Sequence, residues 1–138
     1  MIKKIIALIS LLICSCVVHA EGNDLIKDIE NSARSWLALA DEGQYTESWR
    51  KASQHLRNKK TETDWVKTIE AIRRPLGLKE ARYIATAGYT EGLSGFPKGE
   101  YVVVQFYTTF KIKGLALETV TLAKENNGVW QVADYKIK

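Results

Sequence analysis

The sequence predicts an α+β domain in which three N-terminal helices pack on a curved, four-stranded antiparallel sheet. Apolar residues recur at steps of three and four through the first half of the chain, the spacing that builds one apolar stripe along a helix. From Lys79 onward the period changes to two, and the composition turns to tyrosine, valine, threonine and phenylalanine, which suit a pleated surface. Helices followed by antiparallel strands is the element order of an α+β domain.

The first twenty residues have the pattern of a signal peptide. Lys3 and Lys4 precede an apolar run over residues 5–18, and the residues that follow suit cleavage after Ala20. We therefore expect a signal peptide at 1–20, a single α+β domain at 21–138, and a periplasmic or secreted protein. The apolar run is shorter than the about 20 residues that cross a bilayer, so we expect no stable membrane span after cleavage.

Lipidation at Cys16 is the alternative to cleavage after Ala20, because a late cysteine in an apolar segment anchors bacterial lipoproteins. The preceding Ile13-Cys14-Ser15 makes a poor lipoprotein box, so cleavage is favoured. Removal of residues 1–20 takes away both cysteines, and the mature chain then has no thiol for a disulfide. It also removes two lysines, so the net charge falls from +4 to +2, which argues against nucleic acid as a partner.

Three amphipathic helices are expected in the N-terminal half. The first spans residues 25–40 and ends at the turn 41–43, and the second follows that turn. The third opens with a capping box at residues 61–64 and stops before Pro75. The apolar residues expected on the buried faces include Trp36, Leu37, Trp49, Ala52, Leu56, Trp65, Ile69 and Ile72.

Four strands are expected in the C-terminal half, separated by turn residues. A glycine and proline loop at 92–99 joins the first two strands, and hairpin turns are expected at 113–114 and 126–128. The expected strands lie near residues 79–90, 99–112, 115–125 and 129–137.

The register of the last hairpin decides which side chains face a cavity. A two-residue turn at Asn127-Gly128 pairs Val120 with Tyr135, whereas a three-residue turn pairs Val120 with Asp134, and one residue of slip exchanges the faces. We favour the three-residue turn because it collects the apolar residues of both strands on the face toward the helices. With a two-residue turn at 113–114, that same face also receives Gln105, Tyr107, Glu118 and Asp134.

Glu118 and Asp134 are the first candidates for chemistry, because two carboxylates in an apolar cavity can differ in pKa and act as acid and base. The alternative is that both carboxylates are solvated or paired with neighbouring lysines. Arg73, at a helix end beside the sheet, is a candidate partner of Glu118 or of an acidic ligand. The candidate ligand pocket therefore comprises Glu118, Asp134, Tyr107, Gln105 and Arg73.

Other chemistry-bearing residues point to no catalytic centre. Tyr107 and Tyr135 are candidate donors to a ligand oxygen, with half-buried packing as the alternative. His55 is the only histidine left after cleavage, so neither a multi-histidine nor a cysteine-containing metal site can be built. We therefore assign no catalytic residue, metal or cofactor.

The chain also shows a set of spaced motifs that are typical of a known family. The first set is Trp36-Leu37, Asp41-x-Gly43-x-Tyr45-x-x-Ser48-Trp49, Trp65, Arg73-x-Pro75-x-Gly77 and Arg82. The strand half continues with Pro97-x-Gly99-Glu100-Tyr101, Gln105-Phe106, Glu118-Thr119-Val120, Gly128-x-Trp130 and Tyr135. With these residues the chain resembles domain-of-unknown-function family 4019, a family of exported bacterial proteins. The resemblance implies a cone-shaped domain of the nuclear-transport-factor-2-like type, and it implies no catalytic residue.

Three hypotheses about function follow. The leading one is a periplasmic, non-enzymatic domain that binds a small molecule or a protein through the cone's cavity or its sheet. The alternative is a small-molecule isomerase or hydrolase that uses Glu118 or Asp134 in the cavity. A third hypothesis is a homodimer through the other sheet face, because the strand at residues 101–107 is apolar on both faces.

Overall fold

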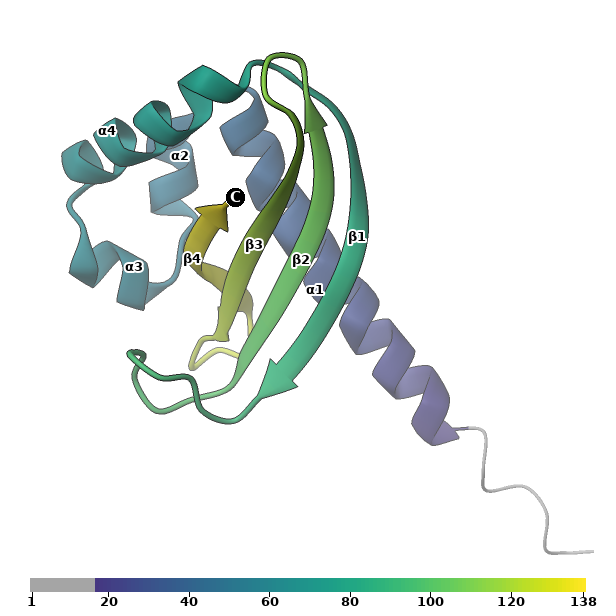
Figure 1. Ribbon diagram of the computed structural model, residues 1–138. Helices are drawn as coiled ribbons and strands as arrows, with labels where there is room; N and C mark the ends of the chain where they lie inside the picture. The colour runs from purple at the N-terminus through teal and green to yellow at the C-terminus, as the bar shows by residue number, and fades with distance from the viewer. Residues whose placement is uncertain (1–16) are drawn as a thin grey trace, which may run out of the picture.

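Helices come first and four antiparallel strands follow in the computed structural model, which describes residues 17–138 (Figure 1). The predicted α+β class is confirmed. Most of the predicted signal peptide, including Cys14 and Cys16, lies outside the described residues. The elements are α1 (Val17–Asp41), α2 (Tyr45–Arg50), α3 (Gln54–Lys59), α4 (Glu62–Arg73), the 3-10 turn η1 (Arg74–Leu76), β1 (Lys79–Thr90), β2 (Tyr101–Phe110), β3 (Gly114–Lys124) and β4 (Trp130–Ile137).

The second predicted helix is two short helices, α2 and α3, and the reason lies at Ser53. Its backbone is extended, with φ −64° and ψ 159°, and its Oγ accepts a hydrogen bond from the backbone N of Leu56 at 3.3 Å. The backbone N of Ser53 donates to the carbonyl of Val132 on β4 at 2.8 Å. Ser53 therefore caps α3 and ties the helical layer to the sheet, which a continuous helix would not allow.

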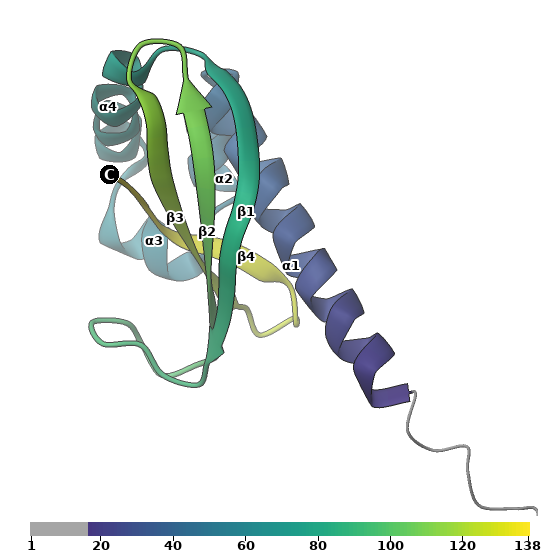
Figure 2. The same ribbon diagram turned by 45° about the vertical axis from the view of Figure 1, so that its right-hand side comes forward.

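The helices lie on the concave side of the curved sheet, whose strand order is β1-β2-β3-β4 (Figures 1 and 2). One buried apolar cluster joins the two layers. Ser48 sits at its centre, where its carbonyl and its Oγ accept hydrogen bonds at 2.9 Å from the indole Nε1 atoms of Trp36 and Trp65 respectively. The cluster includes Ile29, Leu37, Leu56, Ile69, Val102, Val104, Phe106, Val120, Leu122 and Val132.

The hairpin between β2 and β3 turns over three residues, so the predicted two-residue turn at 113–114 is wrong. Phe110 pairs with Gly114, whose φ of 81° lies in the left-handed region that glycine adopts without strain. The backbone N atoms of Ile112 and Lys113 both donate to the carbonyl of Leu76, which holds the longer turn. Phe106 therefore pairs with Glu118.

The hairpin between β3 and β4 keeps the favoured register only near its turn. Leu122 pairs with Val132 as expected for the three-residue turn, but Ala133 is an extra residue on β4, and beyond this bulge Val120 pairs with Tyr135. A bulge reverses the alternation of the strand that carries it. Tyr135 therefore faces the helices, and Asp134 lies on the outer face, contrary to the prediction.

Candidate functional site

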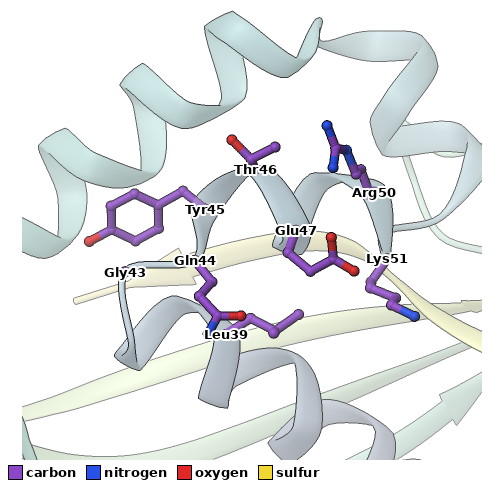
Figure 3. Close-up of a pocket in the computed structure, with 8 residues that line it drawn as sticks. All are labelled: Leu39, Gly43, Gln44, Tyr45, Thr46, Glu47, Arg50 and Lys51. Atoms are coloured by element: carbon purple, nitrogen blue, oxygen red, sulfur yellow. The ribbon is translucent and has the colours of Figure 1, made fainter.

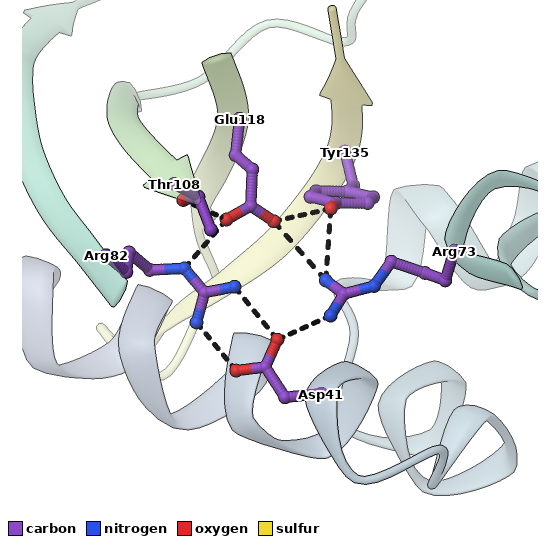
Figure 4. A network of polar contacts seen from close by, with 6 residues as sticks. All are labelled: Asp41, Arg73, Arg82, Thr108, Glu118 and Tyr135. Atoms are coloured by element: carbon purple, nitrogen blue, oxygen red, sulfur yellow. Dashed lines mark hydrogen bonds and ion pairs between the residues drawn. The ribbon is translucent and has the colours of Figure 1, made fainter. Parts of the chain in front are cut away.

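Four charged side chains meet beneath the concave face of the sheet, each from a different element (Figure 4). Asp41 ends α1, Arg73 ends α4, Arg82 lies on β1 and Glu118 lies on β3. We call these four residues the charge ring, because carboxylate and guanidinium alternate around it. Thr108 of β2 and Tyr135 of β4 add two neutral hydroxyl groups.

Glu118 accepts two hydrogen bonds at each carboxylate oxygen. Its Oε1 accepts from the Nε of Arg82 at 2.7 Å and from the Oγ1 of Thr108 at 2.5 Å. Its Oε2 accepts from the Nη1 of Arg73 at 3.3 Å and from the hydroxyl of Tyr135 at 2.5 Å. The side chain is 0% exposed, so these four donors replace the water that the carboxylate would otherwise bind.

Asp41 closes the ring from the helical side. Its Oδ1 accepts from the Nη2 of Arg73 at 2.6 Å and from the Nη2 of Arg82 at 2.9 Å, and its Oδ2 accepts from the Nη1 of Arg82 at 2.7 Å. The side chains of both arginines are 5% exposed and that of Asp41 is 14% exposed. Two positive and two negative charges balance, which lets the ring be buried without an unpaired charge.

The surroundings fix the protonation of the ring at neutral pH. Burial alone would raise the pKa of Asp41, but hydrogen bonds from Arg82 and Arg73, and their charges, hold it below its ordinary value. Burial, together with the charge of Glu118, raises the pKa of Tyr135 well above its ordinary value. Tyr135 therefore remains a protonated donor to Glu118 while Asp41 remains ionised.

Local sequence explains how the two helix-end residues reach the ring. Gly43, with φ 74°, follows the end of α1 and turns the chain away directly after Asp41. Pro75 prevents α4 from continuing, so Arg73 lies in its last turn beside the sheet. The guanidinium of Arg73 also lies 5.0 Å from the ring centroid of Phe110, a cation–π contact that helps to fix its orientation.

The candidate pocket drawn from the sequence divides between the two sheet faces. Arg73 and Glu118 are in contact, whereas the other three residues lie on the outer face. Gln105 joins a polar row across the strands there, and Tyr107 is exposed. Asp134 lies 3.7 Å from the Nζ of Lys136. The paired acid and base of the enzyme hypothesis is therefore wrong, because the two carboxylates are separated by the sheet.

Sequence reasoning about chemistry missed Asp41, Arg82 and Thr108, and it considered Tyr135 only as a ligand donor. Asp41 was interpreted as a helix-terminating residue, and Arg82 was assigned no chemical role. One signal was available, since Asp41, Arg82 and Tyr135 are among the motif residues on which the family resemblance depends. Thr108 carried no signal in the sequence.

The ring leaves little opportunity for substrate chemistry. Every oxygen of its two carboxylates already accepts a hydrogen bond from a residue of the chain. Among residues 17–138, no group of three histidine, cysteine, aspartate or glutamate side chains is placed to hold a metal ion. No helix in the same range is long and apolar enough to span a membrane.

Two surface hollows lie away from the charge ring. One of about 620 Å³ lies at the end of α1, the following turn and α2 (Figure 3), and a smaller one of about 290 Å³ lies at the end of α4. Figure 3 shows polar side chains around an open depression, and neither hollow is lined by a residue of the charge ring. A ligand cavity of the predicted kind, lined by Glu118, is therefore not among them.

The outer face of the sheet exposes large apolar side chains. Tyr83 of β1 pairs with Tyr107 of β2, which pairs with Leu117 of β3, so these three form one row across the sheet. Both tyrosines are exposed, and Leu115 is exposed beside them. A patch of this kind on an isolated domain is typical of a binding surface.

The model of one protein family matches the chain, and its description is "Protein of unknown function (DUF4019)". The match covers residues 32–135, which include the whole charge ring, Thr108 and Tyr135. No curated protein matches the chain.

Proposed function

Because the chain belongs to the DUF4019 family, whose description gives no activity, we propose a function from its geometry: it is an exported, non-enzymatic binding domain. Its binding surface is the outer face of the sheet, around Tyr83, Tyr107 and Leu115. Export rests on the signal-peptide pattern of residues 1–20, with cleavage after Ala20. The charge ring, in this proposal, stabilises the fold and takes no part in recognition.

The observation that carries the proposal is the contrast between the two faces of one sheet. On the concave face, Glu118 is fully buried and each of its oxygens has two donors. On the outer face, Tyr83 and Tyr107 lie side by side with their rings exposed. Removing apolar surface from water lowers the free energy of the system, so the exposed tyrosines favour binding of a partner at the outer face.

Native mass spectrometry of the protein recovered from the export compartment, without refolding, tests the proposal. We expect a chain that begins at Glu21 and carries no small molecule in its interior. A bound molecule that departs on denaturation, and that a double variant Tyr83→Ser with Tyr107→Ser still retains, would place the binding site inside the cone and overturn the proposal. A chain that keeps residues 1–20 would overturn the export part.

An apolar dye, 1-anilinonaphthalene-8-sulfonate, tests the outer face directly. The folded protein is expected to enhance its fluorescence, and Tyr107→Ser is expected to reduce that enhancement. Tyr89→Ser is the matched control, because Tyr89 and Tyr107 are each 53% exposed but Tyr89 does not belong to the outer row. Equal losses in both variants would contradict a binding surface at the outer face.

A further inference from the structure

One end of the sheet carries an exposed, basic and apolar tip. It is formed by the turn between β2 and β3 and by the short link from η1 to β1, which run side by side (Figure 1). Figures 1 and 2 place it at the opposite end of the molecule from the start of α1. We call this region the tip, and its residues are Leu78, Lys79, Lys111, Ile112, Lys113 and Leu115.

Backbone contacts hold the tip in place while its apolar side chains remain outside. Lys111 donates from its backbone N to the carbonyl of Leu78 at 2.8 Å, next to the two bonds that the turn donates to Leu76. Gly77 lies so close to Ile112 that a Cβ there would come within 2.8 Å of its Cγ1. Leu76 is also part of a small buried cluster beneath the turn, so the tip rests on a packed base.

The apolar residues of the tip are among the most exposed in the described chain. Leu78 is 70% exposed, Ile112 is 72% exposed and Leu115 is 68% exposed. Three large aliphatic side chains are therefore in contact with water at one end of the sheet, and their burial by a partner would be favourable. Covering these three side chains would therefore make a large favourable contribution to the free energy of binding.

Positive charge surrounds these aliphatic side chains. Lys79, Lys111 and Lys113 are exposed, and Glu80 is the single acidic residue in residues 76–80 and 110–116, so the region has an excess of two positive charges. None of the three lysines forms an ion pair with another described residue. Their charge is thus available to a partner.

Tyrosines form the next layer behind the tip. Tyr107 lies three residues before the end of β2, and its strand partner Tyr83 lies four residues after Lys79. The order from the tip inward is aliphatic side chains with lysines, then tyrosines, then the body of the sheet. Tyrosine is enriched where a protein crosses the boundary between a membrane and water.

From this arrangement we infer that the tip docks on the surface of a membrane that contains anionic lipid. The inference rests on the proposed function and names the partner of its outer face. The aliphatic side chains of Leu78, Ile112 and Leu115 enter the boundary between headgroups and acyl chains. The lysines bind the lipid phosphates, and their long side chains reach the headgroups while the aliphatic residues go deeper.

A membrane suits this surface better than a second copy of the chain or a folded protein. Two copies packed tip to tip would bring six lysines together, and like charges at an interface oppose association. A folded protein would need a pocket that matches three projecting aliphatic side chains, whereas a bilayer deforms around them. The combination of aliphatic and basic residues at the tip is therefore best matched by an anionic bilayer.

Flotation with lipid vesicles tests the inference, using the protein purified from cells that express the full chain. Vesicles of phosphatidylcholine with phosphatidylglycerol are expected to carry the protein upward, and pure phosphatidylcholine vesicles to carry much less. Lys79, Lys111 and Lys113 replaced together by glutamine are expected to weaken binding about a hundredfold, since each lysine near an anionic surface contributes about fivefold, equivalent to about 1 kcal/mol. Added salt should weaken binding as well.

A second lysine triple provides the matched control. Lys51, Lys59 and Lys98 are exposed and lie outside the tip, so their replacement by glutamine removes the same charge elsewhere. This variant is expected to float as the wild type does. Equal weakening by both triples would show only a general attraction between a basic protein and anionic lipid, and would overturn the docking mode.

A dye attached at position 112 reports insertion itself. The mature chain has no cysteine, so Ile112→Cys labelled with an environment-sensitive fluorophore is uniquely modified. Vesicles with phosphatidylglycerol should shift its emission to the blue, whereas the same dye on Asn127→Cys, in the turn at the other end of the sheet, should not respond. An unchanged emission at position 112 would contradict insertion of the tip.

The results also separate this inference from the proposed function. Wild-type protein that ignores the vesicles, but binds the apolar dye through Tyr107, would overturn the membrane partner and leave the outer face as a binding surface. A dimer that Tyr107→Ser dissociates would do the same and name a second copy as the occupant. A small molecule held inside the cone would instead contradict the proposed function.

Discussion

The two faces of the sheet are built from the same strands, yet one buries charged groups and the other exposes apolar groups. On the concave face, the charged Glu118 is fully buried, whereas on the outer face Tyr107, the residue after the strand partner of Glu118, has an exposed ring. The four charges of the ring are all paired, whereas the rings of Tyr83 and Tyr107 on the outer face are exposed. Under the proposed function the concave face supplies stability and the outer face supplies recognition, so substitutions should separate the two properties.

The largest loss of stability is expected from Glu118→Gln. The amide has the shape of the carboxylate but leaves Arg73 and Arg82 with one negative charge between them. Removing one partner of a buried ion pair costs about 3–5 kcal/mol, because it leaves an uncompensated charge. A domain has only about 5–15 kcal/mol of stability in total, so the urea midpoint should fall by a large fraction.

Glu100→Gln is the control for that prediction. Glu100 is a surface carboxylate that accepts from Tyr89 and pairs with Lys124 at 3.3 Å, so its replacement should leave the urea midpoint close to that of the wild type. Equal midpoints for Glu118→Gln and Glu100→Gln would mean that the ring does not stabilise the fold. The comparison between the two faces would then fail.

A smaller loss is expected from Tyr135→Phe, which removes one neutral donor and keeps all four charges. Its hydroxyl donates to Glu118 at 2.5 Å and accepts from Arg73 at 3.2 Å. Hydrogen bonds to charged groups contribute about 1.5–3 kcal/mol, so a decrease of that size is expected in urea unfolding. A loss as large as that of Glu118→Gln would indicate that the hydroxyl, and not the charge balance, holds the ring.

The raised pKa of Tyr135 predicts that the free energy of unfolding decreases at alkaline pH. Its pKa is raised in the folded state above the ordinary 10.0, so the contribution is fully present below about pH 10 and is lost as pH rises through the folded value. Tyr135→Phe should therefore show a flatter decline above about pH 10 than the wild type. Parallel declines in the two proteins would assign the alkaline limb to other groups.

Protonation of Asp41 at acidic pH should lower the free energy of unfolding. The pKa of this carboxyl is lowered in the folded state below its ordinary 3.8, so its contribution is present above about pH 4 and is lost as pH falls through the folded value. Urea midpoints measured from neutral pH to about pH 3 should decline, and Asp41→Asn should decline less steeply from a lower starting value. An acid limb unchanged by Asp41→Asn would contradict this assignment.

Much of the fold followed from the sequence because periodicity is a local property. The change from a period near 3.6 to a period of two located the boundary at Lys79, which is the first residue of β1. The break between α2 and α3 was missed because Ser53 ends the helix by bonding to Val132, far away in the sequence. The local pattern of apolar residues carries no information about a hydrogen bond between such distant residues.

The site was harder to predict, because face assignment depends on register. β2 is apolar on both faces over residues 101–107, so its own sequence does not indicate whether the odd-numbered or the even-numbered residues face the helices. The three-residue turn at 111–113, in place of a two-residue turn at 113–114, directs Tyr107 outward. One bulged residue, Ala133, directs Asp134 outward and Tyr135 inward. Glu118 was expected on the face toward the helices because it alternates with Val120 and Leu122, with a solvated position as the alternative, and the structure buries it on that face.

The smallest effect on stability is expected where the largest effect on binding is expected, at Tyr107. Its ring is half-exposed on the outer face, and surface substitutions change stability by no more than about 0.5 kcal/mol. Tyr107→Ser should therefore keep the wild-type urea midpoint while it reduces binding of the apolar dye. If Tyr107→Ser unfolded the protein as readily as Glu118→Gln, the outer face would be part of the folded core, and stability and recognition would not be divided between the two faces. If the urea midpoint is retained and dye binding is lost, the ring of Tyr107 is not needed for the stability of the fold. Binding of a partner then remains as the reason for an exposed tyrosine row.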